Sequence, residues 1–227
     1  MYGMLVRWNG SSFFQKASTI TYIIAESKNE ISFIDDKDHQ RFVRLLYVAN
    51  GDRPFVFRDI EDKAFDEIDR GEPIVAIGAY VLMPNHFHIL LKEIVEGGIS
   101  MFMGKLLTGY SSYFNKRNRR TGSLFQGPYQ AQHADRDEYL KYLFAYIHLN
   151  PVKLIEPKWK EEGIRNKAAA KQLLKKYEYS SYADHMRMMR EGNLILSVKE
   201  FPNYFSKHNE FADFLEDWLT YKDFKNT

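Results

Sequence analysis

The chain has no cysteine, so it can form neither a disulfide framework nor a zinc site with thiolate ligands. It has no run that approaches the roughly 18 consecutive apolar residues of a membrane-spanning helix. Residues 1–15 contain no apolar stretch of signal-peptide length. Net charge is only +2, so overall charge argues neither for nor against a nucleic-acid partner. Together these absences predict a soluble, cytoplasmic protein.

Hydrophobic residues make up 44% of the 227-residue chain, which is enough to bury the core of one domain, or of one domain with an extension. Aromatic residues make up 15%, with 15 tyrosines among them. That tyrosine content suits a core and also suits stacking on bases. We find no internal repeat and no low-complexity tract.

Apolar patterning predicts a mixed set of elements, after residues 1–17, which carry no clear pattern. Runs rich in β-branched or apolar residues predict strands over 18–27, 74–83, 86–92 and 129–133. Three-and-four spacing predicts helices over 35–49, 100–114, 135–150, 164–177, 180–190 and 209–221, with a short charged helix over 61–70. Ser100 is a candidate cap, and Asp135 with Glu138 a candidate capping box. This order predicts an α+β fold: a sheet with helices on one face.

Two histidines follow a predicted Pro84-Asn85 turn. His86 and His88 are two apart on a strand, so their side chains point to the same face, while Phe87 points to the other. Two neutral imidazoles at this spacing can hold one metal ion. Such a pair taken alone is more often structural, but the flanking Met-Pro-Asn and Ile-Leu-Leu favour the metal site.

A second candidate group lies on the helix predicted before Pro151. Tyr146 and Asn150 are four residues apart, and therefore only about 40° apart around the helix. Both can face a cleft beside the sheet, where Asn150 could supply a third, oxygen ligand. The alternative, that Asn150 simply caps the helix end, is equally compatible with its position. His148 points to nearly the opposite side and is not a predicted ligand.

The densest basic cluster ends a predicted helix and comprises Lys116, Arg117, Arg119 and Arg120. Cations suit the negative end of the helix dipole, which is the structural explanation. A glycine-rich turn and aromatic residues follow, including Tyr129. That combination favours contacts with a phosphate backbone and with stacked bases.

These motifs together resemble the REP-associated tyrosine transposases, within the single-tyrosine HUH transposases of small insertion sequences. The matching segments span about residues 16–185 and are MPNHFHILL, YFNKRNRRTGSLFQGPYQA, YLKYLFAYIHLNPVK and YEYSSYADH. Two positions depart from the family pattern. Pro128 stands where a basic residue is frequent, and the glycine usual after NPVK is replaced by Leu154-Ile155.

The resemblance implies a ferredoxin-like antiparallel sheet in a catalytic domain of residues 1–185, with a helical C-terminal extension over 186–227. It implies that His86, His88 and Asn150 hold Mg²⁺ or Mn²⁺ and that Tyr146 is the nucleophile. The implied activity is cleavage and transfer of single-stranded DNA near a hairpin through a 5′-phosphotyrosine. The implied setting is cytoplasmic and nucleoid-associated, with both monomers and homodimers among relatives.

Three alternatives stay open at this point. The chain could be a domesticated DNA-binding protein of the same fold that no longer cuts. It could be a metal-dependent hydrolase that uses His86 and His88 on a small molecule, with no role for Tyr146. It could also bind RNA, which would require exposed aromatic residues on adjacent strands, whereas these strand faces are predicted to be buried.

Overall fold

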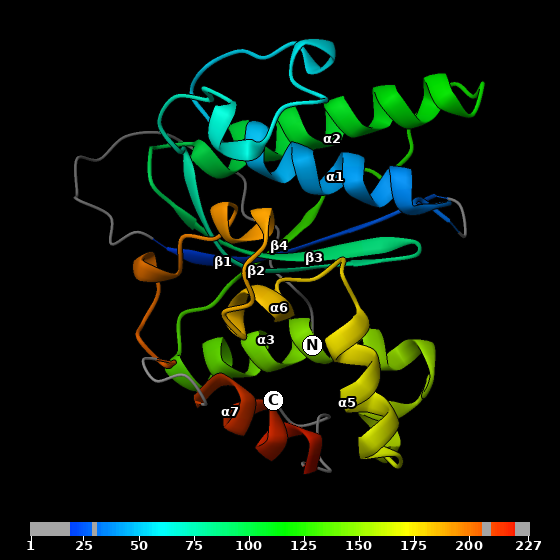
Figure 1. The fold of residues 1–227 in the computed structure, drawn as a ribbon, viewed down its shortest axis with the longest axis vertical. Coiled ribbons are helices and arrows are strands. Elements are labelled where there is room, and N and C mark those ends of the chain that lie inside the picture. Colours follow the sequence, from blue (N-terminus) through cyan, green and yellow to red (C-terminus); the bar gives the residue numbers. More distant parts are fainter. Residues whose placement is uncertain (1–18, 29–30, 206–209, 221–227) are drawn as a thin grey trace.

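The computed structural model describes residues 19–28, 31–205 and 210–220, so the predicted pattern-free segment 1–17 lies outside the described residues. Four strands form one antiparallel sheet in the order β2-β3-β1-β4 (Figure 1). The strands are β1 (Ile20–Glu26), β2 (Val75–Met83), β3 (His86–Glu93) and β4 (Gln130–His133). Helix α1 (Asp36–Val48) connects β1 to β2, and α2 (Gly98–Arg117) connects β3 to β4. This ferredoxin-like α+β fold confirms the predicted fold class.

Helices cover both faces of the sheet (Figure 1). The prediction that the helices lie on one face is therefore wrong, because β2 is buried on both faces and both need a cover. Helices α1 and α2 cover one face and pack with Phe87, Ile89 and Leu91 of β3 in one core. The second face is covered by α3 (Asp137–Leu149), with α5 (Lys167–Lys176), α6 (Tyr182–His185) and α7 (Glu210–Thr220) around it. The short α4 (Trp159–Glu162) joins this layer through Trp159. None of the described helices is long and apolar enough to cross a membrane.

Strand β2 lies at the end of the sheet, but its outer edge is covered by the chain itself. All nine of its residues are buried. The backbone N–H of Leu82 donates to Tyr179 O, and that of Ser181 donates to Tyr80 O, both at 2.9 Å. Segment 179–181 therefore removes hydrogen-bonding groups that an exposed edge would offer to another strand.

Several predicted element boundaries are wrong for local reasons. The segment 61–70 is no helix: it contains a 3₁₀ turn at Phe65–Glu67 and otherwise turns and loop, because it has no continuous apolar stripe to bury. Helix α2 starts at Gly98 rather than at Ser100, after Gly97 takes a left-handed φ of 72° that favours glycine. Only Tyr182–His185 of the predicted helix 180–190 is α-helical.

The predicted capping box at the start of α3 is also absent. Its N-cap is Arg136, which makes no side-chain capping bond, and Asp137 begins the helix. Acidic Asp137 and Glu138 instead occupy the first turn, where negative charge suits the helix dipole.

Two buried histidines join α3 and α6 to the sheet. His148 Nδ1 lies 2.7 Å from Phe144 O and its Nε2 lies 2.8 Å from the Ser181 hydroxyl. His185 Nε2 donates to Gly78 O at 2.9 Å. Burial lowers the pKa of His148 well below its usual range and that of His185 to about 4. Both side chains are therefore neutral packing elements at pH 7.

We expect the free energy of unfolding to fall as pH drops below about 6.5. An unfolded histidine takes up a proton near pH 6.5, while folded His185 resists protonation down to about pH 4. The contribution of neutral His185 to the free energy of unfolding is therefore fully present above about pH 6.5. It falls by about 3 kcal/mol as the pH drops from about 6.5 to about 4. Urea unfolding between pH 7.5 and 4 measures it. His185→Gln should flatten the profile; an equally steep profile in this variant would contradict the assignment.

Candidate active site

His86 and His88 lie on β3 and face α3, while Phe87 lies in the opposite core, as strand alternation predicts. Their ring centroids are 4.8 Å apart and their planes are nearly perpendicular. His88 is buried, whereas His86, at the first position of the strand, is partly exposed. The pair therefore has one anchored imidazole and one beside solvent.

The Nδ1 atom of each histidine already has an oxygen partner. His86 Nδ1 lies 2.7 Å from Asn85 Oδ1, which can only accept, so Nδ1 carries the proton. His88 Nδ1 lies 2.5 Å from the hydroxyl of Tyr22 on β1. His88 Nε2 is buried with no hydrogen-bond partner of good geometry among the described residues. Metal-binding histidines have this pattern, in which an oxygen at one nitrogen leaves the other free for the ion.

Helix α3 brings the second motif to the same place. The ring centroid of Tyr146 lies 5.4 Å from that of His88 and 6.4 Å from that of Tyr22. Asn150 follows at the C-cap of α3 and is 2% exposed. Its side chain lies beside both imidazoles and interacts with each, which slightly opposes the lowering of their pKa. One chain therefore assembles all four predicted centre residues.

The electrostatics keep both imidazoles neutral. Burial lowers the pKa of His86 to about 4, with a further contribution from the positive charge of Lys153. Burial also lowers the pKa of His88 well below its usual range, helped by the charges of His86 and Lys160. A neutral imidazole is the form that binds a metal ion.

The Tyr146 ring is held by its neighbours. It stacks on Tyr142 at 5.7 Å and on Trp159 at 6.2 Å, and Lys160 Nζ lies 4.3 Å from its centroid. Tyr142 stacks in turn on Tyr139 at 6.1 Å, so the three tyrosines of α3 form one stack beside the histidines. Sequence patterns did not identify Tyr22, Trp159 or Lys160 as neighbours of this site.

A metal ion is compatible with this donor set. The described residues contain no group of three or more His, Cys, Asp or Glu side chains that could hold an ion. The candidate set instead combines two imidazoles with the amide oxygen of Asn150. The Nε2 atom of buried His88 is the observation that favours an ion here, because it makes no hydrogen bond of good geometry with any described residue and an unsatisfied buried polar atom is costly.

The predicted DNA-binding cluster lies at the end of α2, on the sheet face opposite the histidines. Lys116 and Arg119 are exposed. The Arg120 guanidinium lies 5.8 Å from the Phe114 ring centroid, and Tyr129 packs against the α1–α2 core. These placements leave Lys116 and Arg119 as the members best exposed to a ligand.

Arg117 has structural partners instead. Its guanidinium pairs with Asp35, the N-cap of α1, and with the fully buried Asp38. Tyr113 also donates to Asp38, at 3.0 Å. Arg117 therefore ties the end of α2 to the start of α1, and its charge neutralises a buried carboxylate.

An antiparallel sheet that brings two imidazoles, an amide and a phenol together defines a candidate site for phosphoryl transfer. Residues 63–150, which include all four groups, match the family described as "Transposase IS200 like". The resemblance to a transposase family is therefore confirmed over this segment, and the match supports a transposase function. No curated protein matches the chain.

Among solved structures, the chain is similar to one described as "Structure of the REP associates tyrosine transposase bound to a REP hairpin". Sequence identity is 13% and the TM-score is 0.48. The alignment covers 80% of this chain and 90% of that chain.

Proposed function

We propose that this protein is a transposase that cuts and rejoins single-stranded DNA, with Tyr146 as the nucleophile. The observation that carries the proposal is the 5.4 Å separation of the Tyr146 and His88 rings inside one chain. A small-molecule hydrolase built on the histidines would give Tyr146 no role, so its place beside them favours the transposase.

Within this proposal, His86 and His88 hold Mg²⁺ or Mn²⁺ through their Nε2 atoms, and Asn150 through its amide oxygen. When bound, the ion would neutralise charge on the scissile phosphate. Imidazole ligands favour Mn²⁺ in affinity. Asn85 and Tyr22 orient the two rings from behind, through the Nδ1 atoms.

The chain's own residues then account for the chemistry. The Tyr146 oxygen attacks phosphorus in line, a bond from phosphorus to tyrosine forms, and the bond to the 3′ oxygen breaks. The phenolic proton passes to water, and the leaving 3′ oxygen takes a proton from water and becomes a 3′-OH, while the 5′ phosphate stays on Tyr146. A free phenol is a weak nucleophile, and Lys160 places a positive charge 4.3 Å from the centre of the Tyr146 ring.

The phosphotyrosine conserves the phosphodiester bond energy. A 3′-OH from the same or another strand can therefore attack it, reform a phosphodiester and release Tyr146. No nucleotide cofactor is needed for either step. The preference for a site near a hairpin follows from the motif resemblance.

A direct experiment tests the proposal. The full chain is incubated with end-labelled oligonucleotides and Mn²⁺, and protein–DNA adducts that survive denaturation are separated on a gel. We expect adducts with single strands, more with a hairpin flank, and none with EDTA or with a fully paired duplex. Binding without adducts under all conditions would instead favour the domesticated, non-cutting alternative.

Tyr22→Phe should weaken metal binding without unfolding the site. The variant keeps the ring but removes the hydroxyl that orients His88, and loss of such a supporting partner typically costs about 10–100-fold in metal affinity. Calorimetric titration with Mn²⁺ measures the change. Tyr139→Phe, on the same sheet face, is the matched control, because the hydroxyl at His88 Nδ1 is that of Tyr22. Equal affinities in the two variants would remove Tyr22 from this role.

A further inference from the structure

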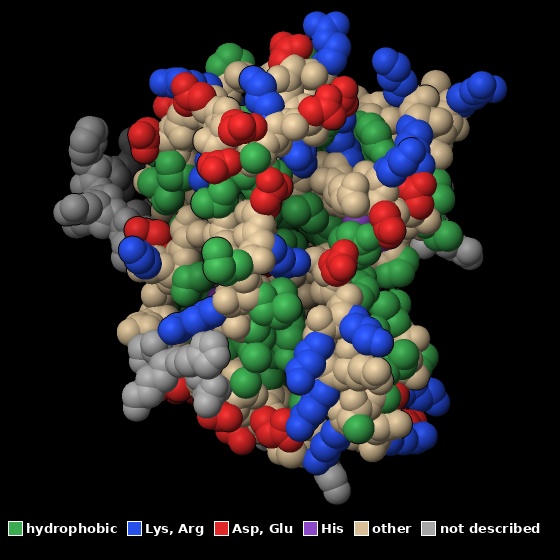
Figure 2. All heavy atoms as spheres, viewed as in Figure 1, with side chains coloured by type: hydrophobic (Ala, Val, Ile, Leu, Met, Phe, Trp, Pro, Cys, Tyr) green, Lys and Arg blue, Asp and Glu red, His purple; other side chains and the backbone are tan. Residues whose placement is uncertain are grey.

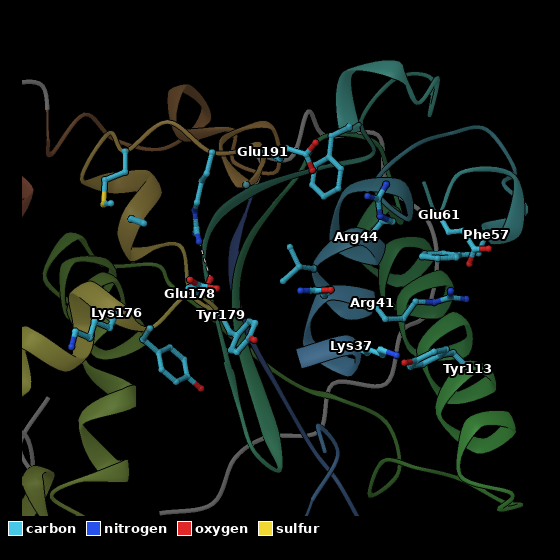
Figure 3. A pocket seen from close by; sticks show the side chains of 18 of the residues that line it. Lys37, Arg41, Arg44, Phe57, Glu61, Tyr113, Lys176, Glu178, Tyr179 and Glu191 are labelled. Atoms are coloured by element: carbon cyan, nitrogen blue, oxygen red, sulfur yellow. Dashed lines mark hydrogen bonds between the residues drawn. The ribbon is translucent and has the colours of Figure 1, made fainter. Parts of the chain in front are cut away.

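A large groove opens beside the covered edge of β2, apart from the candidate active site (Figure 3). Its volume is about 980 Å³, and none of His86, His88, Tyr146 or Asn150 lines it. One wall is α1 with Phe57 and Tyr113, and the other is the segment that runs from the end of α5 to Gly192. The volume lies at the upper end of the range of about 300–1,000 Å³ typical of ligand sites.

The groove carries a surplus of positive charge. Six cationic side chains line it: Lys37, Arg41, Arg44, Lys175, Lys176 and Arg190. Three carboxylates face them, Glu61, Glu178 and Glu191. Among the ion pairs of the described residues, Arg190 alone of the six pairs with a carboxylate, the buried Asp184, so the cations exceed the carboxylates by two. Glu61 interacts with Arg41 at longer range. Arg44 donates to the backbone oxygens of Ile60 and Lys63, which leaves its charge uncompensated.

Contacts with two aromatic rings fix the guanidinium of Arg41 in the wall of the groove. Its guanidinium lies 3.0 Å from the Phe57 ring centroid and 4.7 Å from that of Tyr113. Its Nε is buried and has no hydrogen-bond partner in the part of the chain that the structure describes. The guanidinium lines the groove, and its fork matches the geometry of a phosphate that enters there.

Aromatic rings on the opposite wall are equally fixed. The Tyr179 hydroxyl donates to Asp36 at 2.5 Å, and its ring stacks on His39 at 3.9 Å. The Tyr177 hydroxyl donates to Leu82 O at 2.5 Å. Rigid rings beside lysines and arginines are the combination that holds the bases and backbone of single strands.

Packing between two helical elements links the groove to the candidate active site. Helix α5, whose last residues line the groove, packs against the 3₁₀ helix Asn150–Leu154, which begins at the proposed metal-binding amide. Lys and Arg side chains gather over the region of α5 in Figure 2.

We propose that the groove binds a single-stranded segment of the DNA substrate, outside the phosphate that is cut. Phosphates contact Lys37, Arg41 and Lys176, and bases lie against the aromatic side chains. The identity of the strand as DNA rests on the proposed function. The groove adds affinity and positions the strand, and takes no part in bond breaking.

The test measures binding without cleavage, in the full chain carrying Tyr146→Phe. Anisotropy titrations with a labelled 20-nucleotide strand at several salt concentrations give the slope of log K against log salt. We expect Lys37→Gln with Lys176→Gln, one exposed lysine from each wall, to reduce the slope by about 1.4, since each phosphate contact in a single strand contributes about 0.7. Arg41→Gln should reduce it by about 0.7.

The matched control is Arg58→Gln with Lys63→Gln, which removes the same charge from exposed side chains outside the groove. It should leave the slope unchanged. An unchanged slope in the groove variants, or an equal reduction in the control, would overturn the proposal. Displacement of the strand by polyglutamate at equal charge concentration would overturn it too, because it would identify a general anion surface.

The two proposals fail in different ways. If the unmutated chain forms no adduct but the groove variants still change the slope, the cutting function is wrong and the groove stands. If adducts form and the slope does not change, the groove proposal alone is wrong.

Discussion

Tyr146→Phe is expected to abolish covalent protein–DNA adducts, with a loss of at least about 10³-fold in single-turnover rate, because the variant keeps the ring and loses the attacking oxygen. The ring contacts with Tyr142, Trp159 and His88 do not need the hydroxyl. Affinity for uncut single strands should therefore stay within about twofold, a change of under 0.5 kcal/mol. Gel-resolved adducts and anisotropy measure the two quantities.

Tyr142→Phe is the matched control for this variant. Tyr142 stacks on Tyr146 and lies on the same helix, but it is more deeply buried. This substitution should leave adduct formation nearly unchanged. Adducts that persist in Tyr146→Phe and vanish in Tyr142→Phe would transfer the nucleophile role to the neighbouring tyrosine.

The second large effect is expected for His86→Ala. Removing one of three proposed ligands should lower Mn²⁺ affinity by at least about 100-fold, more than the loss of a supporting partner costs. Cleavage should fall in parallel. His86 is partly exposed at the start of β3, so the change leaves no large cavity. Electron paramagnetic resonance of free Mn²⁺ measures the affinity independently of activity.

His133→Ala provides the control, because His133 is an exposed histidine at the end of β4 whose Nδ1 lies 3.3 Å from the Thr21 hydroxyl. It should bind Mn²⁺ like the unmutated chain. If His86→Ala binds Mn²⁺ as tightly as His133→Ala, the two-histidine site is wrong, even if the tyrosine acts as proposed.

The sheet could be predicted from sequence because its strands carry strong local signals. Strand β2 is an unbroken apolar run buried on both faces, and β3 alternates between its imidazoles and Phe87. The same alternation predicted that His86 and His88 share a face. Helical spacing predicted that Tyr146 and Asn150 share a stripe, and the fold brings that stripe onto the histidine face.

The neighbours of the site could not be predicted because they depend on pairing between distant segments. Tyr22 reaches His88 because β1 and β3 are antiparallel in a register that places Ile24 opposite His88, with Tyr22 as the diagonal neighbour. No pattern within β1 marks Tyr22. Lys160 likewise reaches Tyr146 from the short helix α4, whose position follows from tertiary packing.

The ion pairs of Arg117 could not be predicted from sequence either, because they too join distant segments. Its place in a basic run favoured DNA contact, and nothing local indicated that Asp35 and Asp38 would lie against it. The N-cap of α1 and the last turn of α2 become neighbours only when the two helices pack together on the sheet. Charge clusters in sequence therefore overstate the charge available to a ligand.

The central claim is that the Tyr146 oxygen becomes bonded to DNA. Mapping the adduct by mass spectrometry tests it most directly: after nuclease trimming and trypsin digestion, peptide 142–153 contains both Tyr142 and Tyr146. Fragmentation should place the residual nucleotide on Tyr146. A nucleotide on Tyr142, on any other residue, or on none would contradict the account.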